Sequence, residues 1–238
     1  MPLKISKIIS ATFIQVTMML MLISCQEKAE NQADTQPIQY LALGDSYTIG
    51  QSVDTSDRWP IQLDAKLKDE GFAVERTDII AQTGWKTSDL LNAIEDTNLE
   101  DYNLISLSIG VNNQFSGIPF EVYTYEFDEL LGRIIDAAGS SRVFIVSIPD
   151  YGVTPFGSNN SETIAQELDE YNEYARLKCD TLNIPYINIT EISRILGASE
   201  GALASDNLHP SGTQYALWVD EMIPTVRGLL GEESIFHF

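Results

Sequence analysis

Cysteine and histidine are nearly absent from this sequence of 238 residues, which contains two of each. One pair of cysteines, Cys25 and Cys179, cannot form the disulfide framework that holds small secreted domains together. Two histidines and scattered carboxylates also form no cluster with the spacing of metal ligands. We therefore expect neither a disulfide scaffold nor a metal site.

Basic residues are scarce too, with 14 lysines and arginines against 35 aspartates and glutamates and a formal net charge of −21. Such a surface repels phosphate backbones and anionic lipid headgroups, so we expect no nucleic-acid partner. Neither a G-x-G-x-x-G motif nor a Walker-type loop occurs, so no nucleotide cofactor is expected. Hydrophobic residues make up 44% of the chain, enough for a globular core.

The first 25 residues have the pattern of an export signal. Lys4 and Lys7 precede an apolar run over 8–23. Residues 22–25, at the end of this segment, read Leu-Ile-Ser-Cys. That ending resembles the bacterial lipobox, whose cysteine becomes the lipidated first residue of the mature protein. We expect 1–25 to be a lipoprotein signal peptide and Cys25 to anchor an exported chain to a bacterial membrane, on its periplasmic or cell-surface side. An ordinary signal peptide and an uncleaved anchor are the alternatives.

Residues 26–37 are polar, lack an apolar period and end in a proline, which is typical of a flexible tether. The rest of the chain, 38–231, shows no repeat and no second composition regime, so we expect one domain and a monomer. With Cys25 lipidated, Cys179 would be the only thiol, and its place in a helical pattern indicates a packed side chain.

Apolar strand-like runs alternate with amphipathic helical patterns along this domain. The strands are expected at 38–44, 72–80, 104–109, 142–148 and 185–189, and the longer helices at 60–68, 88–95, 120–138, 161–182 and 211–230. Alternation of this kind predicts an α/β fold, a three-layer α/β/α arrangement around a flavodoxin-like five-stranded parallel sheet.

The first strand stops abruptly at Gly44-Asp45-Ser46. In open α/β sheets, ligands bind at the carboxyl ends of the strands, so Ser46 would lie where chemistry is expected. A serine there can act as a nucleophile if a base and oxyanion donors converge on it. Otherwise Asp45 and Ser46 form only an Asx-type turn or a helix cap.

Partners for Ser46 are present further along the chain. Gly84 and Asn112 follow the second and third strands, and His209 lies in the loop before the last helix. Asp206 precedes His209 by three residues, so its carboxylate can reach Nδ1–H while Nε2 faces a hydroxyl. His237 is the penultimate residue, where chain ends tend to fray.

Gly44-Asp45-Ser46, Gly84, Gly110-Val111-Asn112-Asn113 and Asp206-x-x-His209 occur in this order. The series resembles the SGNH (GDSL-type) hydrolase family, named for its Ser, Gly, Asn and His, over essentially all of 38–230. The resemblance implies a serine esterase that forms an acyl-serine intermediate and needs no cofactor.

By this resemblance Ser46 is the nucleophile, His209 the base and Asp206 its orienting acid. The amides of Ser46 and Gly84 and the side chain of Asn112 would form the oxyanion hole. Two positions depart from the common pattern: Tyr47 follows the serine, and Asn113 stands where many members carry aspartate.

Four aromatic residues on loops near the predicted rim are candidates for a substrate pocket: Trp85, Phe115, Tyr151 and Phe156. Each could equally be an ordinary loop anchor. Substrates consistent with an exported esterase are short-chain esters, carbohydrate O-acyl esters and lysophospholipids. The alternative from another class is a non-catalytic, lipid-tethered binding module on the same scaffold.

Overall fold

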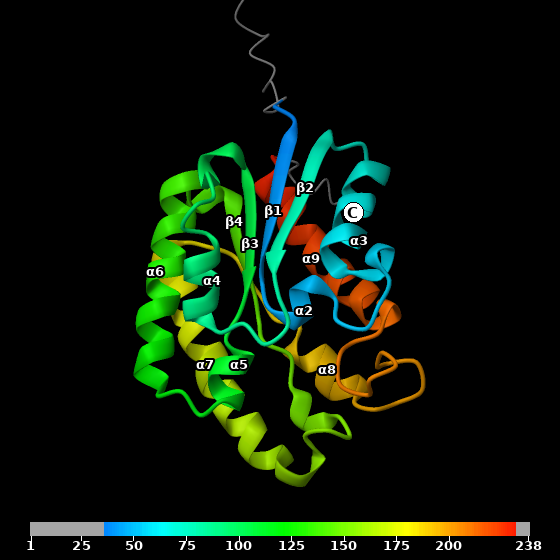
Figure 1. Cartoon of the computed structure of the whole chain (residues 1–238). Helices are drawn as coiled ribbons and strands as arrows, with labels where there is room; N and C mark the ends of the chain where they lie inside the picture. The colour runs from blue at the N-terminus through cyan, green and yellow to red at the C-terminus, as the bar shows by residue number, and fades with distance from the viewer. Residues whose placement is uncertain (1–35, 232–238) are drawn as a thin grey trace, which may run out of the picture. The chain divides into compact units, whose positions relative to one another are not determined.

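A computed structural model describes residues 36–231 (Figure 1). The predicted signal peptide, lipidation at Cys25, most of the tether and His237 lie outside the described residues. The sheet has five parallel strands in the order β2-β1-β3-β4-β5. They are β1 (Ile38–Gly44), β2 (Val74–Ala81), β3 (Leu104–Ser108), β4 (Val143–Val146) and β5 (Tyr186–Ile187). The predicted flavodoxin-like parallel sheet is therefore confirmed.

Helices cover both faces of the sheet, with α4, α6 and α7 on one side and α3 and α9 on the other (Figure 1). The α-helices are α2 (Ser46–Ile49), α3 (Trp59–Asp69), α4 (Thr87–Ala93), α5 (Val111–Phe115), α6 (Phe120–Ala138), α7 (Ser161–Leu182), α8 (Thr190–Leu196) and α9 (Gly212–Leu229). Short 3-10 turns are η1 (Thr55–Asp57), η2 (Leu99–Asp101), η3 (Ser140–Arg142), η4 (Tyr151–Val153) and η5 (Ser158–Asn160). Within 36–231, no helix combines the length and apolarity needed to cross a membrane.

The central strands are buried on both faces, because a helical layer covers each side. Every residue of β3 and β4 is buried, as are the last five of β1. Trp59 from α3 and Trp218 from α9 are fully buried on one side, and Phe127 from α6 is 1% exposed on the other. Burial of each such side chain stabilises the fold by about 1.5–3 kcal/mol. The loops at the strand ends are therefore attached to a stable sheet.

The sheet's register brings three strand ends to one level. Gly44 at the end of β1 pairs with Ala81 of β2 and with Ser108 of β3. The loops that follow these three strands therefore leave the sheet side by side. This is the crevice where the sequence predicts Ser46, Gly84 and Asn112 to meet.

The bounds of β2, β4 and β5 differ from the expectation. β2 begins at Val74 and exposes Glu75 and Arg76, since an edge strand has one neighbour and a thin cover. β4 stops at Val146, two residues early, and β5 has only two residues. Ser147, the residue after β4, still donates its backbone N–H to the carbonyl of Ile187 at 2.9 Å, and the chain after β5 enters α8 at Thr190.

Two short helices, α2 and α5, occupy segments that the sequence pattern assigns to turns. α2 starts two residues after the end of β1 and α5 three residues after the end of β3, and the two helices span four and five residues. A single helical turn is too short to display the 3.6-residue period by which helices are recognised.

Candidate active site

Ser46 is the first residue of α2, and only Asp45 separates it from the end of β1. The carboxylate of Asp45, the N-cap residue, accepts a hydrogen bond from the backbone N–H of Tyr47 at 3.0 Å. This bond satisfies one of the amides that a helix start leaves unpaired. Asp45 thus shapes the turn that presents Ser46, and its side chain is 2% exposed. Burial raises the pKa of Asp45 to about 7, although the amide of Tyr47 partly opposes the shift.

Gly44 permits the close approach of this turn to the sheet. A Cβ atom at Gly44 would lie 2.1 Å from Oγ1 of Thr48 and 2.5 Å from the carbonyl oxygen of Ser108. Both contacts are shorter than van der Waals separation, so only glycine fits between α2 and β3.

Asp206 and His209 form a hydrogen-bonded pair, with Nδ1 of His209 2.7 Å from Oδ2 of Asp206. The other carboxylate oxygen accepts the backbone N–H groups of Leu208 and His209, each at 2.9 Å. Oγ of Ser52 donates to Oδ2 at 2.6 Å. Partial burial raises the pKa of Asp206, but the donors of Ser52 and His209 outweigh it and bring the pKa to about 2. Asp206 is therefore a carboxylate at neutral pH, suited to orient an imidazole.

The two further candidate oxyanion donors are Gly84, on the loop between β2 and α4, and Asn112, in the first turn of α5. Gly84 has φ +85°, a left-handed conformation that glycine adopts without strain, and no atom would contact a Cβ there within 4 Å. Nδ2 of Asn112 donates to the carbonyl of Trp85 at 2.9 Å, which ties the Asn112 side chain to the Gly84 loop. A side-chain amide carries two N–H donors, so the second remains for a ligand.

Asn113 holds the end of the same loop through two hydrogen bonds to Thr87. Its Oδ1 accepts the backbone N–H of Thr87 at 3.0 Å, and its Nδ2 donates to Oγ1 of Thr87 at 2.7 Å. Oγ1 of Thr87 in turn donates to Glu126 of α6. Asn113 is 1% exposed, so the position at which the resemblance expects aspartate is a buried bridge between α5 and the start of α4.

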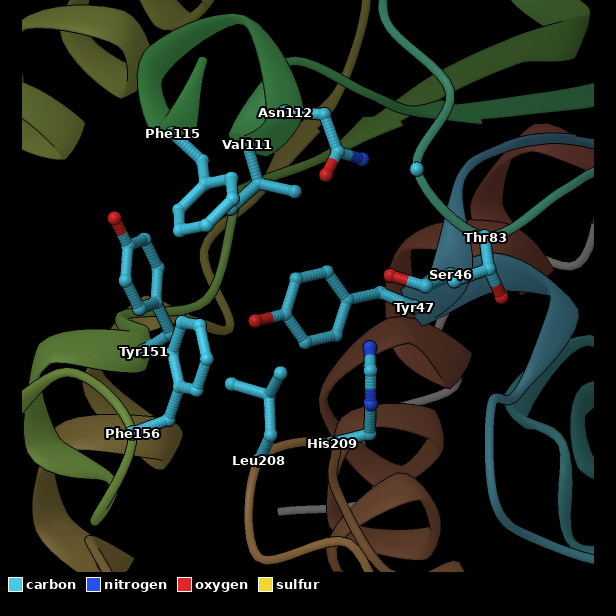
Figure 2. Close-up of a pocket in the computed structure, with 11 residues that line it drawn as sticks. Ser46, Tyr47, Thr83, Val111, Asn112, Phe115, Tyr151, Phe156, Leu208 and His209 are labelled. Atoms are coloured by element: carbon cyan, nitrogen blue, oxygen red, sulfur yellow. The ribbon is translucent and has the colours of Figure 1, made fainter. Parts of the chain in front are cut away.

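The candidate residues surround one cavity of about 140 Å³. Its lining includes Ser46, Gly84, Asn112 and His209, from four separate segments of the chain. Figure 2 shows one imidazole nitrogen of His209 pointing toward Ser46, with Asn112 across the opening. Asp206 is not part of this lining and contacts the far side of the imidazole.

An aromatic wall forms the opposite side of the cavity and consists of Phe115, Tyr151 and Phe156 (Figure 2). Their ring centroids lie 5.8–6.2 Å apart. The hydroxyl of Tyr151 donates to Gln114 at 2.9 Å, which fixes its orientation. Phe115 and Phe156 are 56% and 55% exposed, so they also form the mouth of the cavity.

Trp85 is not part of the cavity lining. Its indole packs partly buried against the core, and its backbone carbonyl holds Asn112. The structure thus groups three of the four predicted pocket aromatics and separates the fourth.

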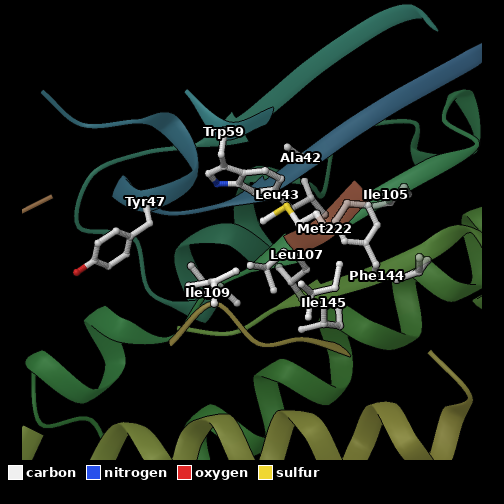
Figure 3. Packing of buried hydrophobic residues seen from close by; sticks show 14 of the residues in the cluster. Ala42, Leu43, Tyr47, Trp59, Ile105, Leu107, Ile109, Phe144, Ile145 and Met222 are labelled. Carbon is white, nitrogen blue, oxygen red and sulfur yellow. The ribbon is translucent and has the colours of Figure 1, made fainter. Parts of the chain in front are cut away.

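Tyr47 lies between the aromatic wall and Ser46. Its ring centroid is 5.4 Å from that of His209, and its side chain is 4% exposed. Figure 2 shows the ring extending across the cavity toward Tyr151 and Phe156, and Figure 3 shows its hydroxyl pointing away from the core residues Leu43 and Leu107. The ring therefore takes up space that a smaller side chain would leave open.

Sequence reasoning overlooked several residues of this site. Val111 and Leu208 line the cavity, Tyr47 crosses it, and Ser52 contacts Asp206 from a distance of 154 positions in the sequence. Each of Val111, Leu208 and Tyr47 is adjacent in sequence to a candidate site residue. This adjacency could have indicated that they line the cavity. No pattern in the sequence indicates the contact of Ser52.

Together, the doubly covered parallel sheet and the polar groups at its carboxyl edge place the chain in the class of flavodoxin-like α/β proteins with a cavity at the strand ends. A family model described as GDSL-like lipase/acylhydrolase matches residues 42–217, and the chain belongs to that family. No curated protein matches the sequence significantly.

Solved structures show the same fold at low sequence identity. TesA has a TM-score of 0.65 at 17% identity, over 80% of this chain and 99% of TesA. An acetyl xylan esterase has a TM-score of 0.64 at 18% identity, over 79% of this chain and 100% of the esterase. Phospholipase A1 from Streptomyces albidoflavus NA297 has a TM-score of 0.62 at 18% identity, over 78% of this chain and 99% of the phospholipase.

Proposed function

We propose that the chain is a serine hydrolase of the SGNH type that cleaves carboxylic esters. The observation that carries the proposal is the single cavity around which Ser46, Gly84, Asn112 and His209 gather. Membership of the GDSL-like lipase/acylhydrolase family supports the same reaction class.

In the proposed mechanism, Oγ of Ser46 attacks the ester carbonyl while Nε2 of His209 takes its proton. Asp206 keeps the imidazole in the tautomer with Nδ1 protonated and stabilises the imidazolium that forms. The tetrahedral intermediate collapses as His209 gives the proton to the leaving alcohol. Water, deprotonated by His209, then attacks the acyl-serine, and His209 returns this proton to Oγ of Ser46 as the bond between Oγ and the acyl carbon breaks and the carboxylic acid is released.

The backbone N–H groups of Ser46 and Gly84 and the side-chain amide of Asn112 are proposed to receive the developing oxyanion. A donor of this kind lowers the barrier by about 3 kcal/mol. The side-chain amide of Asn112 is neutral. It can therefore donate to the oxyanion without placing a second positive charge near the imidazolium of His209.

The proposed substrates are esters of short acyl groups. A cavity of about 140 Å³ is small beside the roughly 300 Å³ at which drug-sized ligand pockets begin. The structural neighbours include an acetyl xylan esterase and a phospholipase A1, so they do not choose between acetyl and long-chain acyl groups. The cavity size and the ring of Tyr47 favour the short groups, on a small alcohol or a carbohydrate.

A series of p-nitrophenyl esters from acetate to palmitate tests this choice with the full-length chain. The proposal predicts the highest kcat/KM at two to four carbons and a steep decline beyond. A maximum at long chains would refute the short-acyl preference and favour lysophospholipids.

The rival function is a binding module that uses Ser46 only for contacts. It predicts no hydrolysis and no covalent reaction with a fluorophosphonate probe. Hydrolysis that disappears in Ser46→Ala, with an unchanged circular dichroism spectrum, would eliminate this rival.

Export and lipid anchoring through Cys25 are part of the proposal and rest on the sequence of residues 1–25. Mass spectrometry of the protein from a bacterial host is expected to find a diacylglyceryl group on Cys25, absent in Cys25→Ala. An unmodified Cys25 within an uncleaved chain would contradict the anchoring.

A further inference from the structure

Ser52 has a backbone conformation that serine seldom adopts. Its φ is 67°, in the left-handed region where Asn, Asp and Gly predominate. The residue is exposed, so burial in the core does not enforce this conformation. A strained residue of this kind persists where the surrounding contacts require it.

The contact that Ser52 makes is to the candidate acid. Its Oγ donates to Oδ2 of Asp206 at 2.6 Å, the same oxygen that meets Nδ1 of His209 at 2.7 Å. The backbone N–H groups of Leu208 and His209 occupy the other oxygen, Oδ1. Oδ2 thus has two side-chain partners, and Ser52 is the one that does not depend on the imidazole. Ser52 and the two backbone N–H groups therefore orient both oxygens of the carboxylate without the imidazole.

The preceding residue, Gln51, connects two other parts of the site. Its Oε1 accepts the hydroxyl of Thr83 at 2.5 Å, and Thr83 precedes Gly84. Its backbone N–H donates to the carbonyl of Ser46 at 3.0 Å. Two adjacent residues therefore contact the nucleophile turn, the Gly84 loop and the acid, which come from three distant segments of the chain.

We propose that Ser52 is a positioning residue for ester hydrolysis, which aligns Asp206 and through it His209, on a turn that Gln51 fastens to Ser46 and Thr83. The inference rests on the proposed function, because a binding module would not need an aligned imidazole. Ser52 does not line the cavity, so its effect reaches the substrate only through Asp206.

The variant Ser52→Gly distinguishes a role of Ser52 in aligning Asp206 from a role in folding stability alone. Glycine adopts φ 67° without strain, so it removes the hydroxyl and keeps the turn. We expect a melting temperature close to that of the wild type, because relief of the left-handed backbone strain offsets the lost hydrogen bond. We also expect kcat to fall roughly threefold to tenfold, since a hydrogen bond to a charged group is lost, while KM stays within about twofold.

Asn183→Gly is the matched control. Asn183 also has a left-handed backbone, with φ 54°, at the end of α7, and its N–H bonds remain within that helix end. Asn183→Gly gives the same backbone freedom at a left-handed position away from Asp206, and it is expected to leave kcat at the wild-type value.

The experiment measures p-nitrophenyl acetate hydrolysis and the rate of Ser46 labelling by a fluorophosphonate, with the full-length chain and kcat expressed per labelled site. Slower hydrolysis and slower labelling in Ser52→Gly, but not in Asn183→Gly, support the inference. Rates equal to wild type in both variants overturn it and leave the proposed function intact. A lower melting temperature with unchanged kcat also overturns it, because Ser52 is then only structural. A wild-type chain that neither hydrolyses the ester nor reacts with the probe overturns the proposed function, and the inference with it.

Discussion

At the scale of single residues, the environment of Ser46 depends on neighbours that take no part in the proposed bond making. Asp45 holds the turn through Tyr47 N–H, and Gly44 leaves room for Thr48. Asp45 and Asp206 are both aspartates of the site, yet their pKa values move in opposite directions. Burial dominates at Asp45, whereas hydroxyl, amide and imidazole donors dominate at Asp206.

The buried carboxyl of Asp45 predicts a pH-dependent stability. Its folded-state pKa of about 7 lies above the unfolded value near 3.9, so the folded state binds the proton more tightly. Its contribution is full below about pH 4 and is lost as the pH rises through about 7, by an amount on the order of a few kcal/mol.

Asp45→Asn keeps the acceptor for Tyr47 N–H and cannot titrate. Urea unfolding from pH 4 to pH 8 is expected to show a smaller loss of the free energy of unfolding in this variant than in the wild type. Parallel pH curves for the two proteins would mean that Asp45 is ionised in the folded state throughout.

Tyr47 is predicted to limit the length of the acyl group. Tyr47→Leu opens the space in front of the aromatic wall, and each buried methylene contributes about 0.8 kcal/mol. The ratio of kcat/KM for hexanoate to that for butyrate is expected to rise about tenfold for these two methylenes. Tyr47→Phe keeps the ring and should retain the wild-type ratio. An unchanged ratio in Tyr47→Leu would place the acyl group elsewhere.

At the scale of elements, the site depends on how short segments at the strand ends hold one another. Asn113 of α5 joins Thr87 at the start of α4, and Thr87 joins Glu126 of α6. The hydroxyl of Thr87 has one hydrogen, which it gives to Glu126, while it accepts from Asn113. The loop that carries Gly84 ends at Thr87. Its position therefore depends on which of the three side chains donates and which accepts in these hydrogen bonds.

Two substitutions can reverse the donors and acceptors of the hydrogen bonds that Thr87 makes to Asn113 and Glu126. Asn113→Asp removes the donor to Thr87 and leaves two carboxylates competing for one hydroxyl hydrogen, which is expected to lower the free energy of unfolding by about 1–3 kcal/mol. Glu126→Gln in that background supplies a new donor and should recover most of the loss. Urea denaturation of both variants checks this, and additive effects would show that the bridge is not coupled.

The order and type of the main elements could be predicted from the sequence, because β3, β4 and α6 have strong apolar patterns. The ends of the elements could not be predicted, since β5 keeps only two of the five residues that the sequence pattern assigns to it. Candidate partners Gly84, Asn112 and His209 could be placed because each follows or precedes an identifiable element. The contact between Ser52 and Asp206 and the separation of Trp85 from the cavity depend on side-chain packing across distant segments, which no local pattern records.

At the scale of the whole molecule, the charge of −21 sets which substrates approach the cavity easily. The surface of such a chain repels anions over a distance that the ionic strength determines, about 30 Å at 0.01 M and 8 Å at 0.15 M. A neutral short-chain ester is little affected by this field. An anionic ester is repelled most strongly at low salt.

Salt is therefore expected to discriminate between the two kinds of ester. Raising sodium chloride from 10 to 150 mM should lower KM severalfold for an anionic hemisuccinate ester and leave KM for p-nitrophenyl acetate nearly constant. Steady-state kinetics at both concentrations measure this. Equal salt dependence for both esters would show that the acidic surface does not act at the cavity.

In the proposed mechanism, Ser46 is an acyl-accepting nucleophile activated by His209. It is tested most directly by treating the full-length chain with a fluorophosphonate and locating the adduct by peptide mass spectrometry. We expect one adduct, on Ser46, which is lost in Ser46→Ala and forms at least about a hundredfold more slowly in His209→Ala, in line with general-base contributions of about 10²–10⁴. An adduct on another residue, or an unmodified Ser46 in the folded wild-type protein, would contradict it.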